Sequence, residues 1–250
     1  MKTLLNYCLI GASLLFLNSC TKDEPKKHHN CDAELVIDLN VVISSTPLDL
    51  NSTLYPDYLN RNYKIELLKF YLSNWALENS DGITTSLEGL HLVNFESDEI
   101  LNFEVTIDKG TYSNLHFGIG LDSLTNSSDP AEFESSHPLS ISQNTYWSWA
   151  SKYKFFMLEG RIDTVNGFNP NKVFSYHTGF NQLYREVTIP LNNLSIESDV
   201  DTLHLELDLD KVIHGDTGTV DLVNESTSHT LDEISEKISD NLVTSFTLKQ

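Results

Sequence analysis

The sequence predicts an all-β fold: a β-sandwich or barrel-like single domain with one short helix near the C-terminus. Three observations lead to this prediction. Apolar and polar residues alternate in several segments, turn-forming residues separate these segments, and only one segment shows helical periodicity. No linker is visible after Asp32, so residues 32–250 are expected to form one large domain.

Four segments alternate strictly between apolar and polar residues, and each is expected to form a strand with one buried face. These segments are 35–43, 101–107, 115–121 and 203–209. Further strands are expected in 63–77, 87–95, 153–158, 173–177 and 183–189, and Asp81-Gly82 predicts a hairpin between two of them. About nine strands suit a sandwich or a barrel.

The single helix is expected near the end of the chain, where it would pack across a sheet. Its apolar residues recur at helical spacing, namely Leu231, Ile234, Ile238 and Leu242. Segment 122–144 has neither period and contains Pro130 and Pro138. Loops of this length without regular structure are often functional, so this segment is expected to contribute to binding.

The N-terminus is expected to be a lipoprotein signal peptide, residues 1–19. Lys2 precedes an uncharged apolar run that ends at Leu17, which is too short to span a membrane. The following Asn18-Ser19-Cys20 resembles a bacterial lipobox, so Cys20 is predicted to carry the lipid; the alternative is an ordinary cleaved signal with an incidental Cys20. Residues 20–31 are charged and would form the anchor and a flexible tether. The chain is thus expected in the cell envelope, lipid-anchored to the outer membrane and either periplasmic or surface-exposed.

The charge is strongly negative, with a formal net charge of -20. Binding to phosphates needs the opposite sign, so nucleic acid is an unsuitable partner, whereas a cation or a basic surface is favoured. Cys8 leaves with the signal and Cys20 is lipidated, which leaves Cys31 without a partner for a disulfide within the chain. Common catalytic motifs are absent, including Gly-x-Ser-x-Gly and His-Glu-x-x-His, so we do not expect an enzyme.

The aromatic and histidine-rich middle of the chain resembles the MbnP-like copper-binding proteins, a group of periplasmic and lipid-anchored proteins. Four blocks carry the resemblance in matching order and spacing: Phe70-Tyr71-Leu72-Ser73-Asn74; Phe117-Gly118-Ile119-Gly120-Leu121-Asp122-Ser123-Leu124 with Asn126; Tyr146-Trp147-Ser148-Trp149 with Tyr153-Lys154-Phe155 and Leu158-Glu159-Gly160; and Tyr176-His177 with Gly179. The resemblance covers roughly Asp32 to Gln250.

This resemblance implies a copper site. Members of the family bind copper through two histidines and an oxidised tryptophan, a kynurenine, whose amine supplies a further nitrogen. The resemblance places His91 and His177 as the metal ligands, and it leaves Trp75, Trp147 and Trp149 as candidates for the modified tryptophan. The chain departs from the family pattern in residues 127–130, where some copper-binding members carry a histidine.

The other histidines have weaker assignments. His116 shares a strand face with Gly118. This face is expected to be either solvent-exposed or closely approached by another backbone. His204 alternates away from a leucine stripe and is expected to be solvated. His137 and His229 lie in or near loops, and the sequence assigns them no role.

Two functions remain open from the sequence. The first is a copper-binding module for uptake, storage or delivery at the envelope, which His91, His177 and the Trp-x-Trp pair favour. The second is a surface interaction lipoprotein that keeps the scaffold without the metal and contacts a protein or a glycan through segment 122–144. The missing histidine in 127–130 and the lack of disulfides favour the second.

Overall fold

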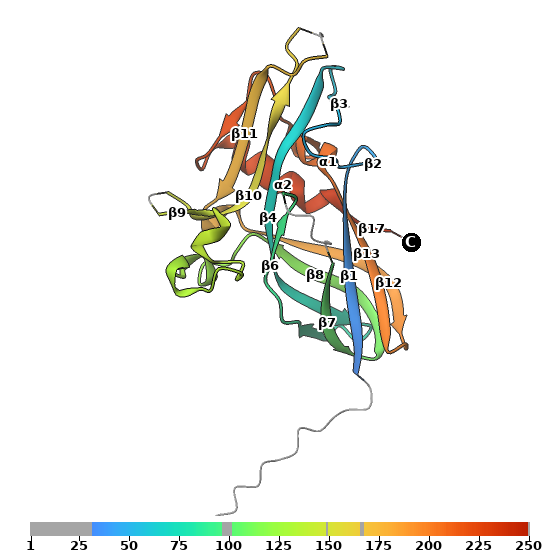
Figure 1. Ribbon diagram of the computed structural model, residues 1–250. Coiled ribbons are helices and arrows are strands. Elements are labelled where there is room, and N and C mark those ends of the chain that lie inside the picture. Colours follow the sequence, from blue (N-terminus) through green and yellow to red (C-terminus); the bar gives the residue numbers. More distant parts are fainter. Residues whose placement is uncertain (1–31, 97–101, 149, 166–167, 250) are drawn as a thin grey trace, which may run out of the picture. The chain divides into compact units, whose positions relative to one another are not determined.

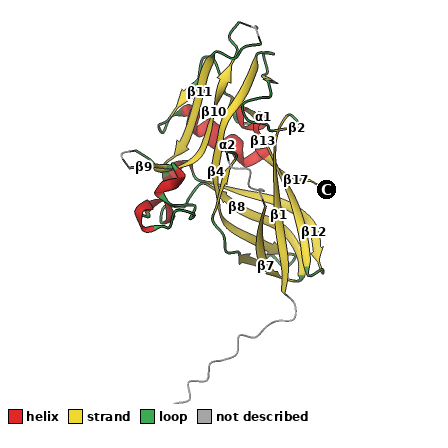
Figure 2. Cartoon of the chain, in the orientation of Figure 1, coloured by secondary structure: helices red, strands yellow, loops and turns green. Residues whose placement is uncertain are grey.

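Two β-sheets, one five-stranded and one ten-stranded, pack face to face in the computed structural model (Figure 1). The structure describes residues 32–96, 102–148, 150–165 and 168–249, which belong to one compact unit, Cys31–Gln250. Strands dominate and helices are few (Figure 2). The predicted all-β fold is confirmed, and the architecture is a sandwich.

The five-stranded sheet has the strand order β17-β13-β1-β2, and β7 also pairs with β1. Its strands are β1 (Asp32–Ile43), β2 (Thr46–Pro47), β7 (Asn102–Asp108), β13 (Val200–Asp208) and β17 (Phe246–Lys249). β1 and β13 pair in parallel, which joins the beginning of the domain to a segment far along the chain. Both strands alternate between buried and exposed residues, as their apolar periods predict.

The ten-stranded sheet has the order β12-β8-β4-β10-β11-β16, and four short strands flank this path. Its strands are β3 (Tyr55–Pro56), β4 (Asn62–Asn79), β5 (Thr84–Ser86), β6 (His91–Asn94), β8 (Gly110–Ile119), β9 (Tyr146–Trp147), β10 (Lys152–Ile162), β11 (Lys172–Gly179), β12 (Arg185–Ile196) and β16 (Thr227–Ser228). A separate two-stranded ribbon contains β14 (His214–Gly215) and β15 (Gly218–Thr219).

Strand β4 organises this sheet because it pairs with β10 along its first half and with β8 along its second half. The register shifts between Ser73 and Ala76, and Asn74 in this bulge has a positive φ of 51°. Asparagine tolerates this left-handed conformation better than most residues, which explains its place in the bulge. The predicted hairpin at Asp81-Gly82 joins β4 to β5, and Gly82 has a φ of 78°.

The predicted helix is α2 (Glu233–Ser245), and it starts two residues after Leu231. Asp232 caps it by accepting a hydrogen bond from the backbone N–H of Ser235, and Ile238 and Leu242 are buried. A second, shorter helix α1 (Leu209–Ile213) was not expected: the predicted strand 203–209 ends at Asp208, whose side chain caps α1. No helix in the described part of the chain is both long and apolar enough to cross a membrane.

Segment 122–144 is folded rather than extended, and Figure 1 shows it beside β9. It contains three short 3₁₀ helices, η1 (Thr125–Ser127), η2 (Pro130–Glu132) and η3 (Ile141–Gln143). The segment covers an apolar cluster on the outer face of the ten-stranded sheet that includes Tyr71, Leu121, Leu139, Tyr153 and Phe155. The Tyr153 hydroxyl donates a hydrogen bond of 2.8 Å to the carbonyl of Leu139. The segment therefore covers the outer face of the sheet beside β9 and the start of β10.

Candidate functional site

The outer face of the ten-stranded sheet carries the polar cluster that we call the outer site, formed by Trp147, Glu159, Ser175, His177 and His229. Side chains alternate along β11, and Phe174 and Tyr176 point into the main core. Ser175 and His177 therefore point outward, together with Glu159, which lies opposite Ser175 on β10.

His177 and His229 stack on each other, with ring centroids 4.4 Å apart and planes inclined by 14°. His229 directly follows β16, and β16 pairs in parallel with β11 through Tyr176 and Ser228. This register brings two histidines together that lie far apart in the sequence. The Ser175 hydroxyl lies 2.8 Å from His229 Nε2 and 3.4 Å from His177 Nε2, so both nitrogens converge on one hydroxyl.

Trp147 contacts both imidazoles. Its ring centroid lies 5.6 Å from that of His177 and 5.5 Å from that of His229, both in edge-on geometry. Trp147 reaches this position because β9 pairs with the start of β10. The Lys154 ammonium lies 5.3 Å from the centroid of the Trp147 ring, within the range of a cation–π interaction. Lys154 is buried, and this burial lowers its pKa.

Glu159 forms a hydrogen bond with His177 Nε2, whereas His177 Nδ1 has no hydrogen-bond partner in the described part of the chain. Glu159 Oε1 lies 2.6 Å from His177 Nε2. His177 Nδ1 is buried and has no hydrogen-bond partner among the described residues. Burial lowers the pKa of His177 to about 4, although the hydrogen bond to Glu159 acts in the opposite direction. Burial also lowers the pKa of His229, so both imidazoles are neutral near pH 7.

A second histidine and tryptophan cluster lies in the core; we call Trp75, His91 and Phe103 the core cluster. His91 stacks on Phe103, with ring centroids 3.8 Å apart, and lies 6.3 Å from the Trp75 ring. A Cβ built on Gly89 would lie 2.5 Å from His91 Nε2, so the backbone of Gly89 occupies the space next to that nitrogen. Burial lowers the pKa of His91 to about 4.

The structure does not bring the two sequence-predicted ligands together. His91 lies opposite Leu72 of β4, on the core side of the sheet, whereas His177 lies opposite Met157 and points outward. The two histidines are on opposite faces of one sheet, so they cannot share an ion. Each has its own tryptophan, Trp75 for His91 and Trp147 for His177.

The remaining predicted residues have different outcomes. Trp149 and Cys20 lie outside the described residues. His229 contacts His177, but no sequence pattern selects it, because the parallel pairing of β16 with β11 joins segments that are not close in the chain. Within the described ranges, no three His, Cys, Asp or Glu side chains are grouped so that they could hold a metal ion.

Comparisons with known proteins identify the family. The MbnP family profile matches residues 32–232. A search of curated proteins gave no match. Among solved structures, MbnP from Methylosinus trichosporium is similar, with a TM-score of 0.53 and 12% sequence identity, over 81% of this chain and 82% of that one. At this identity the structural match shows the fold alone, whereas the profile covers most of the chain. The chain therefore belongs to the MbnP family.

Proposed function

We propose that the outer site binds one copper ion, and that the protein serves copper uptake, storage or delivery at the cell envelope. One observation carries the proposal. Two neutral imidazoles stack beside a tryptophan, and the buried Nδ1 of His177 has no partner among the described residues. The proposal keeps His177 from the sequence analysis and replaces His91 with His229.

The donor chemistry supports copper over harder metals. Imidazole nitrogen suits copper, and copper has the highest affinity among the divalent first-row metals. A metal can bind only a deprotonated imidazole nitrogen, and the lowered pKa of about 4 keeps His177 neutral well below the usual histidine range. Trp147 is our candidate for the modified tryptophan, because it contacts both histidines.

Binding requires one ring to turn. The lone pairs of two nearly parallel rings lie in separate planes, since the His177 and His229 planes differ by only 14°. One ion cannot lie in both planes at once. The imidazole χ2 torsion is broad, and His229 is less buried than His177. Rotation of the His229 ring would therefore allow one of its nitrogens and His177 Nδ1 to reach the same ion.

Titration of the soluble domain, residues 32–250, with Cu(II) tests the site. We expect about one ion per chain, and weaker binding in His177→Ala and His229→Ala. Loss of a ligand should lower the copper affinity by more than the roughly 10–100-fold that is typical when a residue hydrogen-bonded to a ligand is lost. The matched control is His204→Ala, because His204 lies 53% exposed on the other sheet and should bind no ion.

Two outcomes would contradict this assignment. Equal affinity in the wild type and all three variants would remove the outer site from copper binding. If both variants fold, a strong loss of copper affinity in His91→Ala with normal affinity in His229→Ala would restore the ligand pair expected from the sequence.

A second function is supported by the surface of segment 122–144. Leu124 is 83% exposed and Ile141 is 56% exposed, although the segment around them is folded. Exposed apolar residues on a structured loop suit contact with a protein or a glycan. If the domain binds no more copper than an unrelated acidic protein, this interaction lipoprotein without metal and without enzymatic activity becomes the better proposal.

Membrane attachment through Cys20 is part of both proposals. The lipobox-like sequence that ends at Cys20 supports it. The Cys20→Ser variant should lose its lipid and move to the soluble fraction, whereas Cys31→Ser, the matched control, should stay with membranes. Wild-type protein that carries no acyl chain by mass spectrometry would contradict the anchoring.

A further inference from the structure

We propose that Glu159 is a positioning residue of the outer site, which holds His177 in the tautomer that leaves its Nδ1 lone pair free for the metal. This inference rests on the proposed copper function and adds a residue outside the ligand set. It assigns a role to Glu159 of the Leu158-Glu159-Gly160 block, for which the residue pattern alone suggests none.

The hydrogen bond fixes the position of the proton. His177 Nε2 and Glu159 Oε1 are 2.6 Å apart, which is the short distance of a charge-assisted hydrogen bond. An ionised carboxylate can only accept, so Nε2 must carry the hydrogen. A neutral imidazole has one ring hydrogen, and Nδ1 therefore keeps its lone pair.

The environment of Nδ1 agrees with this assignment. Nδ1 is buried, and none of the described residues donates a hydrogen bond to it. Buried acceptors are nearly always satisfied in folded proteins, so an open one needs an explanation. A metal ion bound at Nδ1 would provide the missing partner. Metal-binding histidines commonly donate their other ring N–H to a carboxylate, which is the arrangement that Glu159 makes here.

Other groups near His177 do not replace Glu159. The Ser175 hydroxyl lies 3.4 Å from His177 Nε2 and only 2.8 Å from His229 Nε2, so it serves mainly His229. Lys154 lies over the Trp147 ring and cannot accept a hydrogen bond. Glu159 is thus the acceptor that fixes His177.

The local fold explains why this glutamate points at His177. Glu159 pairs with Ser175, so it lies diagonally across the strand pair from His177 on the same face. The register with β4 shifts between Glu159 and Gly160. A Cβ on Gly160 would lie 2.2 Å from the Lys64 carbonyl oxygen, so only glycine permits this close strand contact.

Two substitutions separate the hydrogen bond from the charge. Glu159→Gln keeps an acceptor oxygen for Nε2–H, whereas Glu159→Leu removes it. In the metal-free domain, ¹⁵N correlation spectra should show the His177 proton on Nε2 in the wild type and in Glu159→Gln. In Glu159→Leu we expect a mixture of tautomers, because no acceptor selects one.

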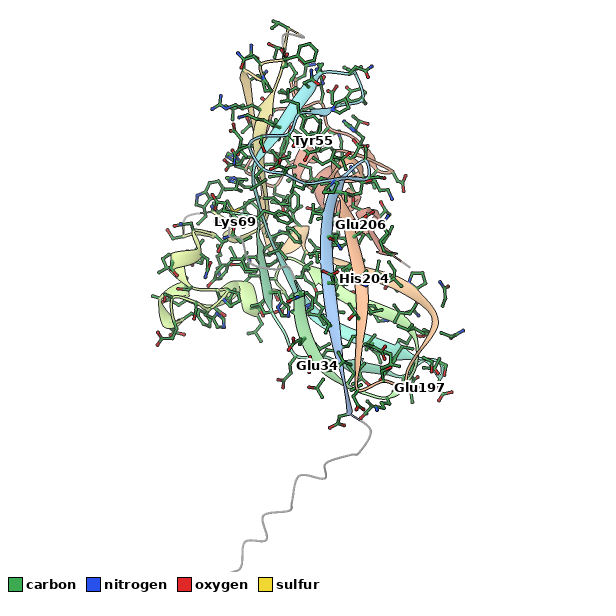
Figure 3. The ribbon with its side chains drawn as sticks, turned by 45° about the vertical axis from the view of Figure 1, so that its right-hand side comes forward. Glu34, Tyr55, Lys69, Glu197, His204 and Glu206 are labelled. Atoms are coloured by element: carbon green, nitrogen blue, oxygen red, sulfur yellow. The ribbon has the colours of Figure 1, made fainter. Side chains whose placement is uncertain are left out.

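Copper titration of the same proteins completes the test. We expect Glu159→Leu to weaken Cu(II) binding by roughly 10–100-fold, and Glu159→Gln to weaken it less. Asp38 provides matched controls, because its carboxylate lies 2.7 Å from His204 Nδ1. His204 lies on β13 of the five-stranded sheet (Figure 3). Asp38→Leu and Asp38→Asn should therefore leave copper affinity unchanged.

The outcomes distinguish this inference from the proposed function. A wild-type His177 with its proton on Nδ1 would overturn the role of Glu159 without any metal. Wild-type copper binding with unchanged affinity in a folded Glu159→Leu variant would overturn it as well, and the copper function would stand. If the wild type binds no copper, the proposed function fails and the positioning role for a metal fails with it, whatever the tautomer.

Discussion

The outer site and the core cluster contain the same residue types but differ in what surrounds them. Each pairs a histidine with a tryptophan, and burial lowers the pKa of His91 and of His177 to about 4. In the core cluster the glycine backbone at Gly89 fills the space at the imidazole nitrogen. His91 Nε2 and His177 Nδ1 are both buried without a hydrogen-bond partner among the described residues, but in the outer site a second imidazole, His229, stacks on the His177 ring. The same lowered pKa therefore occurs in two different surroundings, and it does not by itself distinguish a metal site from a buried core histidine.

The two tryptophans differ in the same way. Trp75 is 1% exposed, and both Phe103 and Phe117 lie with ring centroids 4.7 Å from its own. Trp147 is half-buried, with polar neighbours that include Lys154. Trp75 is thus expected to stabilise the fold, and Trp147 to serve the site.

The largest effect should come from Trp75. Trp75→Ala would leave a large cavity and is expected to lower the free energy of unfolding by about 3–5 kcal/mol. Trp147→Ala should lower it by about 1 kcal/mol, because its ring is only partly enclosed. Urea denaturation of both variants measures the difference. Equal losses would remove the distinction between the two clusters.

The pH dependence of stability should follow His91 and His177, because burial lowers the pKa of both to about 4 in the folded state. The pKa of His91 is about 4 in the folded state and about 6.5 in the unfolded chain, so the unfolded state binds more protons between these values. The stability from neutral His91 is present above pH 6.5 and is lost as the pH falls toward 4.

Urea midpoints between pH 4 and pH 7 check this prediction. His91→Phe removes one of these two titrating groups and should reduce the pH dependence, and the part that remains should come from His177. The same slope in wild type and His91→Phe would show that other groups cause the acid sensitivity.

A smaller effect than that of Trp75→Ala is expected at the contact between segment 122–144 and the sheet. The Tyr71 hydroxyl bonds to Thr145 Oγ1 at 2.6 Å and to the Pro138 carbonyl at 2.8 Å. Tyr71→Phe should lower the free energy of unfolding by about 1–2 kcal/mol, because it leaves buried polar groups without a partner. It should also speed amide hydrogen exchange in 138–145. Unchanged exchange there would show that these bonds do not hold the segment.

Strand faces, one turn and the C-terminal helix could be predicted from local patterns in the sequence. Alternation identified the buried faces of 35–43 and 203–207, Asp81-Gly82 identified a turn, and helical spacing identified α2. These patterns suffice because strand faces, turns and helix stripes depend on residues that are close in the chain. The residue blocks also identified the MbnP family, which the profile match shows.

Which side chains meet depends on strand pairing in the folded chain. Alternation says that neighbouring residues of a strand point to opposite faces, but strand pairing decides which face is covered by the other sheet. This pairing turned His91 into the core and His177 outward. The parallel register of β16 with β11 placed His229 against His177. Such contacts join residues separated by dozens of positions, and no local pattern contains that information.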